Sequence, residues 1–198
     1  MRRVGLAVAA VVFVLSASGA TASARTYSAV AQFCNKFNPY HAWSYTVGGA
    51  ILTQQTNIST DNGRFEAWWN GHSIPTSAIV GVNRTTKTLS FYTIELPPGY
   101  IILDPEYETD SAVEWTAPTT GTFTVAGEFL GIDTHEASHP VAIEHNGSTI
   151  YSNTISAYQQ TEPFNLTVTV AAGDTISFMA DTNGFEFLST GLQATITG

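Results

Sequence analysis

Apolar and polar residues alternate along most of this chain with a period of two. The alternation is cleanest between residues 164 and 170, where Phe164, Leu166, Val168 and Val170 are separated by polar side chains. A period of two places successive side chains on opposite faces of an extended strand, so the pattern predicts strands with one buried face. Glycine and proline separate the alternating segments, and no helical period of comparable length occurs. An all-β fold is therefore predicted.

The alternating segments are numerous enough to form two stacked sheets. Strands are predicted at residues 27–33, 50–52, 65–69, 79–83, 88–96, 100–103, 111–116, 122–129, 141–145, 148–152, 164–170, 176–180 and 192–196. The stretch from 53 to 63 is polar and is left outside the predicted strands. Short strands with only turns between them favour a single antiparallel β-sandwich that is jelly-roll-like.

The segment from 111 to 133 is interpreted as the central hairpin of this sandwich. Pro118 and Gly121 supply turn chemistry between two alternating runs, because proline presets φ and glycine accepts a positive φ. Trp115 shares its face with Val113 and is expected to anchor the core. Gly127 interrupts the apolar face and is expected where another backbone or side chain approaches closely.

Asn146 and Gly147 predict a second, tight hairpin. Both positions of a type I′ turn need positive φ, which Asn-Gly adopts readily. A two-residue loop would place Ile143 opposite Ile150 and Ala142 opposite Tyr151, with the isoleucines on one buried face.

The first 24 residues have the pattern of a cleaved secretory signal peptide. A positive start, an apolar stretch from Val4 to Leu15 and a small-residue site at Ala22-Ser23-Ala24 follow one another. The apolar stretch is shorter than the roughly 20 residues of a spanning helix, and no later segment is long and apolar enough to span. We expect residues 25–198 to form one secreted domain, either extracellular or periplasmic.

Charge then narrows the classes of partner. Residues 25–198 contain 5 basic and 16 acidic side chains, a net charge of −11 with neutral histidine, and no Lys or Arg follows Lys87. Nucleic-acid binding needs cations that neutralise phosphates, so that class is excluded, and polyanions such as heparin and anionic lipid surfaces are disfavoured. Cys34 is the only cysteine and leaves no intrachain disulfide to hold the fold.

Four stretches resemble a family of bacterial secreted β-sandwich domains that are similar to carbohydrate-binding modules. They are EWTAPTTGTFTVAGEFLGID at 114–133, HNGSTIY at 145–151, PFNLTVTVAAGDTISF at 163–178 and GLQATIT at 191–197. Leu103 to Glu106 and Glu114 stand where the family pattern often has His-Pro-Gly and an arginine, so different ligand contacts are expected there. The resemblance implies the sandwich fold and an extracellular binding role.

His135-Glu136-Ala137-Ser138-His139 matches the HExxH pattern of zinc proteases. That site needs the pentapeptide in a helix, so that both imidazoles reach the metal from one face. Pro140 disfavours helical geometry at the preceding residue, so the stretch is predicted to be a loop. Such a loop either binds no metal or forms a looser metal site from His135, His139 and Asp133.

Asp104, Glu106, Glu108 and Asp110 occupy every second position of one acidic segment. On an extended backbone the four would share one side and invite a hard cation such as Ca²⁺. A solvated acidic loop is the alternative.

Aromatic side chains are the candidate ligand-binding residues. Sugars present apolar C–H faces to aromatic rings, and the candidates are Trp43, Tyr45, Trp68, Trp69 and Tyr107. Adjacent Trp68 and Trp69 should point to opposite faces of a strand, leaving one of them outward.

The sequence thus predicts an exported, non-catalytic β-sandwich that binds carbohydrate or another extracellular surface ligand. A structural or adhesive surface subunit is one alternative, and its oligomeric state is left open. A metal-dependent hydrolase that uses the His135–His139 loop, or a glycosidase, is another. No nucleophile elbow or phosphate-binding glycine loop is present in the sequence.

Overall fold

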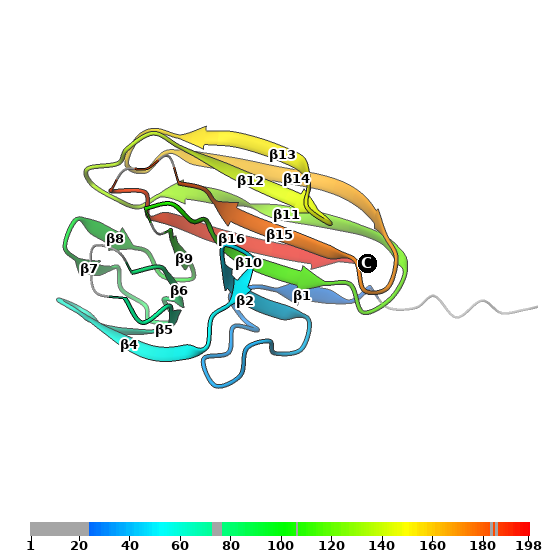
Figure 1. The fold of residues 1–198 in the computed structure, drawn as a ribbon, viewed down its shortest axis with the longest axis horizontal. Coiled ribbons are helices and arrows are strands. Elements are labelled where there is room, and N and C mark those ends of the chain that lie inside the picture. The colour runs from blue at the N-terminus through cyan, green and yellow to red at the C-terminus, as the bar shows by residue number, and fades with distance from the viewer. Residues whose placement is uncertain (1–23, 73–76, 106, 183, 185) are drawn as a thin grey trace, which may run out of the picture.

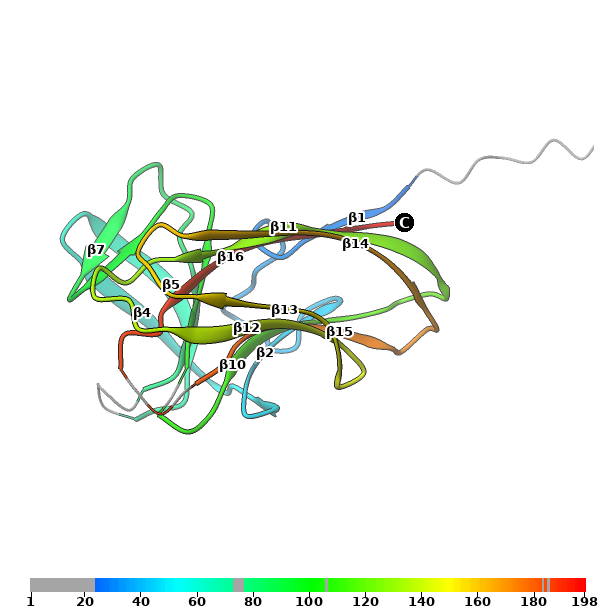
Figure 2. The same cartoon turned by 90° about the horizontal axis from the view of Figure 1, so that it is seen from above.

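A computed structural model describes residues 24–72, 77–105, 107–182, 184 and 186–198. The predicted signal peptide therefore lies, except for Ala24, outside the described residues. The described chain folds into two stacked antiparallel sheets, which Figure 2 shows edge-on as two layers. Within the described residues no helix is long and apolar enough to cross a bilayer. The predicted class, an all-β antiparallel sandwich, is confirmed.

One layer is an eight-stranded sheet in which each strand pairs antiparallel with its neighbours. Its strands, in order across the sheet, are β14 (Thr161–Val170), β11 (Gly121–Gly131), β16 (Thr190–Thr197), β9 (Ile101–Asp104), β6 (Ile79–Val82), β5 (Gly63–Trp69) and β4 (Gln54–Thr60), with β1 (Thr26–Ser28) paired to β16. Strand β4 was not predicted, because its residues are exposed or half-buried and its sequence therefore lacks the apolar alternation that marks a strand.

The second layer is a six-stranded sheet, and a separate two-stranded hairpin lies beside the sandwich. The sheet runs β13 (Ser148–Ile155), β12 (His139–His145), β15 (Thr175–Ala180), β10 (Ser111–Thr116), β2 (Trp43–Val47) and β3 (Ala50–Ile51), and the hairpin is β7 (Leu89–Phe91) with β8 (Ile94–Leu96). From β10 onward almost every connection crosses from one sheet to the other, which is the jelly-roll-like connectivity that was predicted.

The predicted central hairpin is wrong, because its two strands belong to different sheets. Strand β10 pairs with β15 and β2, whereas β11 pairs with β14 and β16. Both strands turn their apolar face toward the same core, so they face each other across the sandwich. Trp115 is fully buried there, and its ring lies 5.1 Å from that of Phe123 in the opposite sheet. The role predicted for Trp115, a core anchor, is confirmed.

A second core covers the outer face of the eight-stranded sheet at one end. Trp68, Val80 and Leu103 point into the main core. The alternate residues of the same strands, among them Ile79 and Ile102, instead pack against the β7–β8 hairpin. Strands β6 and β9 are therefore buried on both faces, which explains their nearly continuous apolar sequences. Figure 1 shows this hairpin at the end of the sandwich opposite the C-terminus.

Three further predictions of strand geometry need correction. The predicted strand 88–96 is a hairpin, in which Phe91 pairs with Ile94 and Tyr92 turns the chain at a φ of 51°. The predicted strand 27–33 ends at Ser28, because the Gln32 N–H donates to the Ser28 carbonyl at 3.0 Å and closes a turn.

The Asn146-Gly147 turn has positive φ at both residues, as predicted, but the register behind it is different. A β-bulge next to Ile143 places Tyr151 opposite that residue and leaves Ile150 exposed. The Tyr151 ring packs against Phe164, 5.9 Å away, and thereby fills the inward position expected for isoleucine. Gly127 behaves as predicted, since a Cβ there would lie 1.9 Å from the Gln193 carbonyl oxygen.

Candidate functional site

A pocket of about 280 Å³ opens where the second core reaches the end of the sandwich. It is lined by the β7–β8 turn, the end of β9 and the residues after it, Asp133, and the segment 186–189 that leads into β16. Ile79, Phe91 and Ile94 form its apolar wall and also belong to the second core. The pocket is thus built by the same packing that holds the hairpin on the sheet.

Three exposed aromatic side chains, each from a different segment, stand around this pocket. Tyr92 is 82% exposed, Tyr107 49% and Phe187 40%. Tyr92 and Phe187 both have positive φ, 51° and 68°, a conformation that costs energy in a bulky residue and recurs at functional sites. An exposed aromatic ring on an unfavourable backbone does not stabilise the fold through burial.

Neighbouring loops hold the aromatic segments in place through hydrogen bonds. The Ala137 N–H donates to the Phe187 carbonyl at 3.0 Å, and the Thr182 hydroxyl donates to the Tyr107 carbonyl at 2.8 Å. Beside the β7–β8 turn, the Thr134 N–H donates to the Thr93 carbonyl at 2.8 Å. The rim of the pocket is therefore fixed by its backbone as well as by packing.

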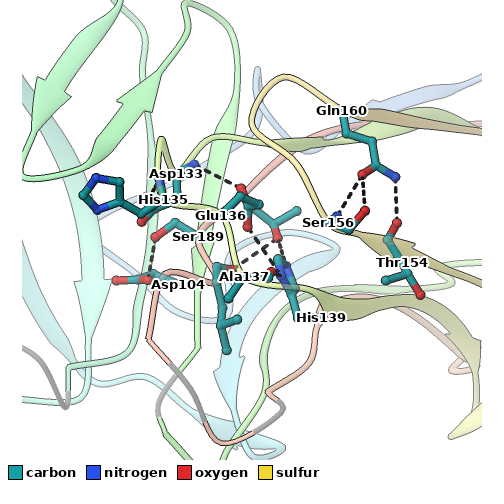
Figure 3. Close-up of polar contacts among 12 residues, drawn as sticks. Asp104, Asp133, His135, Glu136, Ala137, His139, Thr154, Ser156, Gln160 and Ser189 are labelled. Carbon is teal, nitrogen blue, oxygen red and sulfur yellow. Dashed lines mark hydrogen bonds and ion pairs between the residues drawn. The ribbon is translucent and has the colours of Figure 1, made fainter.

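Two carboxyl groups, each held by a hydroxyl, lie in the pocket. Asp104 ends β9 on the same face as Ile102, so its side chain points toward the second core rather than the main core. The Ser189 hydroxyl donates to Asp104 Oδ1 at 2.8 Å, and the Thr93 hydroxyl donates to Asp133 Oδ2 at 2.9 Å. Figure 3 shows the Asp104–Ser189 contact beside the loop that contains Asp133.

Burial weakens the acidity of Asp104. The pKa of Asp104 is raised to about 7, mainly by burial; the Ser189 hydrogen bond lowers this pKa and the charge of Asp133 raises it. Glu186 lies exposed at the mouth of the pocket and adds a third acid. The described lining includes no Lys, Arg or His. The pocket is an acidic hollow with an aromatic rim.

The His135–His139 segment borders this pocket as a loop followed by the first residue of β12, and no helix forms there. His135 turns toward the aromatic rim, with its ring 5.4 Å from that of Phe187. His139 is buried and lies between two protein oxygens, with Nδ1 3.0 Å from the Ala137 carbonyl and Nε2 2.6 Å from the Thr190 hydroxyl. The imidazoles do not converge as a zincin requires, and the described residues hold no cluster of three or more potential metal ligands.

Glu136 has a structural position in the same loop. Its Oε2 accepts a hydrogen bond from the Asp133 N–H at 3.1 Å, and its Oε1 lies 3.5 Å from His139 Nδ1 (Figure 3). Burial raises the pKa of Glu136 to about 8, so the group is mainly protonated at neutral pH. Burial lowers the pKa of His139, which keeps that ring neutral. Glu136 and His139 therefore form a neutral, buried pair, and Glu136 holds the backbone of Asp133 through its N–H.

The predicted ligand-binding aromatics separate into two groups. Trp43, Tyr45 and Trp68 are each 3% exposed or less and belong to the main core, so they offer no surface to a ligand. Their polar atoms are satisfied inside: Trp43 Nε1 donates to Gln32 Oε1 at 2.9 Å and Trp68 Nε1 donates to the Cys34 carbonyl at 2.7 Å. A tryptophan with an internal acceptor can be buried whole, and for these three residues the ligand-contact assignment is corrected.

The other two predicted aromatics are accessible but lie apart. Trp69 does point to the face opposite Trp68, yet it packs half-buried against the second core and lines a different hollow with His72. Tyr107 lines the acidic pocket. The sequence analysis missed Tyr92 and Phe187. One signal was present for Tyr92, since the apolar phase shifts from positions 89 and 91 to 94 and 96, which marks a turn between them.

The four acids proposed for Ca²⁺ do not form one row in the described chain. Asp104 lies in the pocket, Glu106 lies outside the described residues, and the backbone bends from 107 to 109. An extended backbone was the reason to expect all four on one side, and it ends at Asp104. Calcium binding there stays a prediction.

No family model and no curated protein matches the sequence. Solved structures similar to the chain include a family 35 carbohydrate-binding module from Paenibacillus barcinonensis, at 14% identity over 88% of this chain and 98% of that one, with a TM-score of 0.37. A family 35 module from Clostridium thermocellum is 10% identical over 89% and 98%, with a TM-score of 0.36. Another from Cellvibrio japonicus is 16% identical over 59% and 79%, with a TM-score of 0.35. The site is therefore interpreted from its own residues.

Proposed function

We propose that this protein is an exported, non-catalytic carbohydrate-binding domain whose ligand enters the acidic pocket. The observation that supports the proposal most strongly is the exposure of Tyr92, Tyr107 and Phe187 around one concave site. Aromatic rings bind the C–H faces of sugars, and a few fixed polar groups orient the hydroxyls. Asp104 supplies such a group inside the ring of aromatics.

The size of the pocket fits a short recognition element. About 280 Å³ is just below the roughly 300–1,000 Å³ typical of ligand pockets. The fit is to one or two sugar rings, such as the end of a chain or a side branch, rather than to a long flat polysaccharide surface. The protein would then recognise glycan termini.

A pair of acids, one with a raised pKa, is also what a glycosidase uses. Asp133 does not fit the second catalytic position, because it is 2% exposed and both of its oxygens accept hydrogen bonds. The donors are the Thr93 hydroxyl and the His135 N–H. Binding without hydrolysis therefore agrees better with this geometry.

Calorimetric titration of the secreted chain with a panel of soluble oligosaccharides tests the proposal. Tyr107→Ala should weaken binding at least several-fold, because it removes one of the three exposed rings at the rim. Tyr158→Ala is the matched control, as that tyrosine is 39% exposed in the connection between β13 and β14 and lies outside the pocket lining. Absence of binding across the panel, or equal losses in the two variants, would contradict the proposal.

A further inference from the structure

The charge of the pocket narrows the class of sugar, and this inference rests on the proposed function. Its described lining holds three acids, Asp104, Asp133 and Glu186, and no basic side chain. We propose that the pocket selects sugars that bear a protonated amine, such as glucosamine or galactosamine units, over neutral and acidic sugars.

The hydrogen bonds of the two inner acids show where the amine would bind. Both oxygens of Asp133 already accept hydrogen bonds, from the Thr93 hydroxyl and the His135 N–H. Asp104 accepts one, from Ser189 to Oδ1, and the structure gives its Oδ2 no partner among the described residues. An ammonium group has donors but no acceptor, so it complements an acid with an oxygen to spare. Asp104 is the group that would receive it.

The aromatic rim favours the same charge. A cation within about 6 Å of a ring face is attracted by the ring quadrupole, and amines are recognised in cages of aromatic side chains. Tyr92, Tyr107 and Phe187 place three rings at the mouth of the pocket. Rings and carboxylates together bind a sugar through its apolar face and its ammonium group at once.

Electrostatics also oppose the alternative sugars. A uronic acid would bring a carboxylate against Asp104 and Asp133, and like charges brought together in a recognition site weaken binding. A neutral sugar meets no repulsion, but it leaves the paired acids without a counter-charge. The pocket would therefore rank amino sugars above neutral sugars, and neutral sugars above uronic acids.

Oligosaccharides that differ only at the C2 substituent provide a direct test. Glucosamine, N-acetylglucosamine and glucose oligomers share one β-1,4-linked backbone, and galactosamine with N-acetylgalactosamine gives a second matched pair. Neutral galactan and mannan oligomers and polygalacturonate complete the panel. In calorimetry at neutral pH, we expect the free amine of at least one matched pair to bind about tenfold tighter than its acetylated counterpart, roughly 1.4 kcal/mol. A trimethylated amine keeps its charge at every pH but has no N–H donor, so it should keep only the part of that advantage that comes from charge and from the aromatic rim.

Variants of the acids separate charge from folding. Asp104→Asn keeps an oxygen for the Ser189 hydroxyl but removes the charge, so it should abolish most of the advantage of the amine and weaken binding of the neutral counterpart much less than binding of the amine. Glu144→Gln removes the same charge from strand β12 outside the pocket lining and should change neither. Thermal melting of both variants confirms that they fold.

The outcomes distinguish the inference from the function on which it rests. Equal or tighter binding of acetylated, neutral or acidic sugars would overturn the amine selectivity and leave carbohydrate binding in place. An amine advantage that survives Asp104→Asn would also overturn it. No binding to any member of the panel would remove both proposals.

Discussion

The molecule contains two groups of aromatic side chains that look alike in the sequence and differ completely in their surroundings. Trp43, Tyr45 and Trp68 lie in the main core, and the polar atoms of the two tryptophans are satisfied by internal partners. Tyr92, Tyr107 and Phe187 lie exposed around a pocket at one end. The difference shows that ring size does not identify a binding residue. Two of the exposed residues, Tyr92 and Phe187, instead share a positive φ that none of the three buried residues has.

Truncation in the buried group should have the largest effect and should be on stability alone. Trp43→Ala removes a 1% exposed ring that packs 6.4 Å from Phe178 in the main core. We expect it to lower the free energy of unfolding by about 3–5 kcal/mol, as deletion of a buried aromatic ring leaves a cavity. Chemical denaturation measures the loss. A loss below about 1 kcal/mol would mean that the ring is not the core residue described here.

The buried Glu136–His139 pair should produce a pH-dependent effect on stability. The pKa of Glu136 is raised from 4.5 to about 8 by burial, so between these values the unfolded chain is ionised while the folded chain keeps its proton. Stability therefore falls as pH rises through this window, by about 1.4 kcal/mol per unit of pKa difference.

Glu136→Gln keeps an acceptor for the Asp133 N–H and cannot ionise. We expect it to be more stable than wild type at pH 8, with an advantage that shrinks toward pH 4.5. Titration of Asp104 and His139 is common to both chains and cancels in the difference to first order. Denaturation curves at four or five pH values measure this difference in the free energy of unfolding between the variant and wild type. A difference that stays constant with pH would contradict a buried, protonated Glu136.

In the exposed group, truncation should affect binding and leave stability nearly unchanged. Tyr92→Gly removes a ring that is 82% exposed and relieves a φ of 51° that suits glycine. We expect a free energy of unfolding within about 1 kcal/mol of wild type. Glycine relieves the strained φ in the folded state, but it also makes the unfolded chain more flexible, and the two effects oppose each other. Affinity for the best oligosaccharide should fall about tenfold. Wild-type affinity in this variant would remove Tyr92 from the site.

The fold could be predicted from the sequence wherever one face of a strand is buried. Alternation at Phe164, Leu166, Val168 and Val170 predicted β14, and Trp115 was recognised as core from its neighbour Val113. Pairing could not be predicted in the same way. Strands β10 and β11 show a hairpin pattern, yet whether two apolar faces lie side by side or opposite each other depends on the other strands.

The candidate site was predicted only in parts. Tyr107, Asp104 and Asp133 were each singled out, but for separate reasons: an aromatic platform, a calcium row and a loop metal site. They converge because β9 ends beside the loop after β11, a contact between segments about 30 residues apart that no local pattern encodes. Tyr92 and Phe187 were not predicted, because their exposure goes with a positive φ that an aromatic residue does not signal in the sequence.

The most direct test of the binding pocket is backbone amide NMR during titration with the best-binding oligosaccharide. The account predicts the largest shift changes at Thr93, Asp133 and Phe187, and little change at Trp43 and Tyr45. Shift changes centred instead on Trp69 and His72, which line a separate hollow, would contradict it.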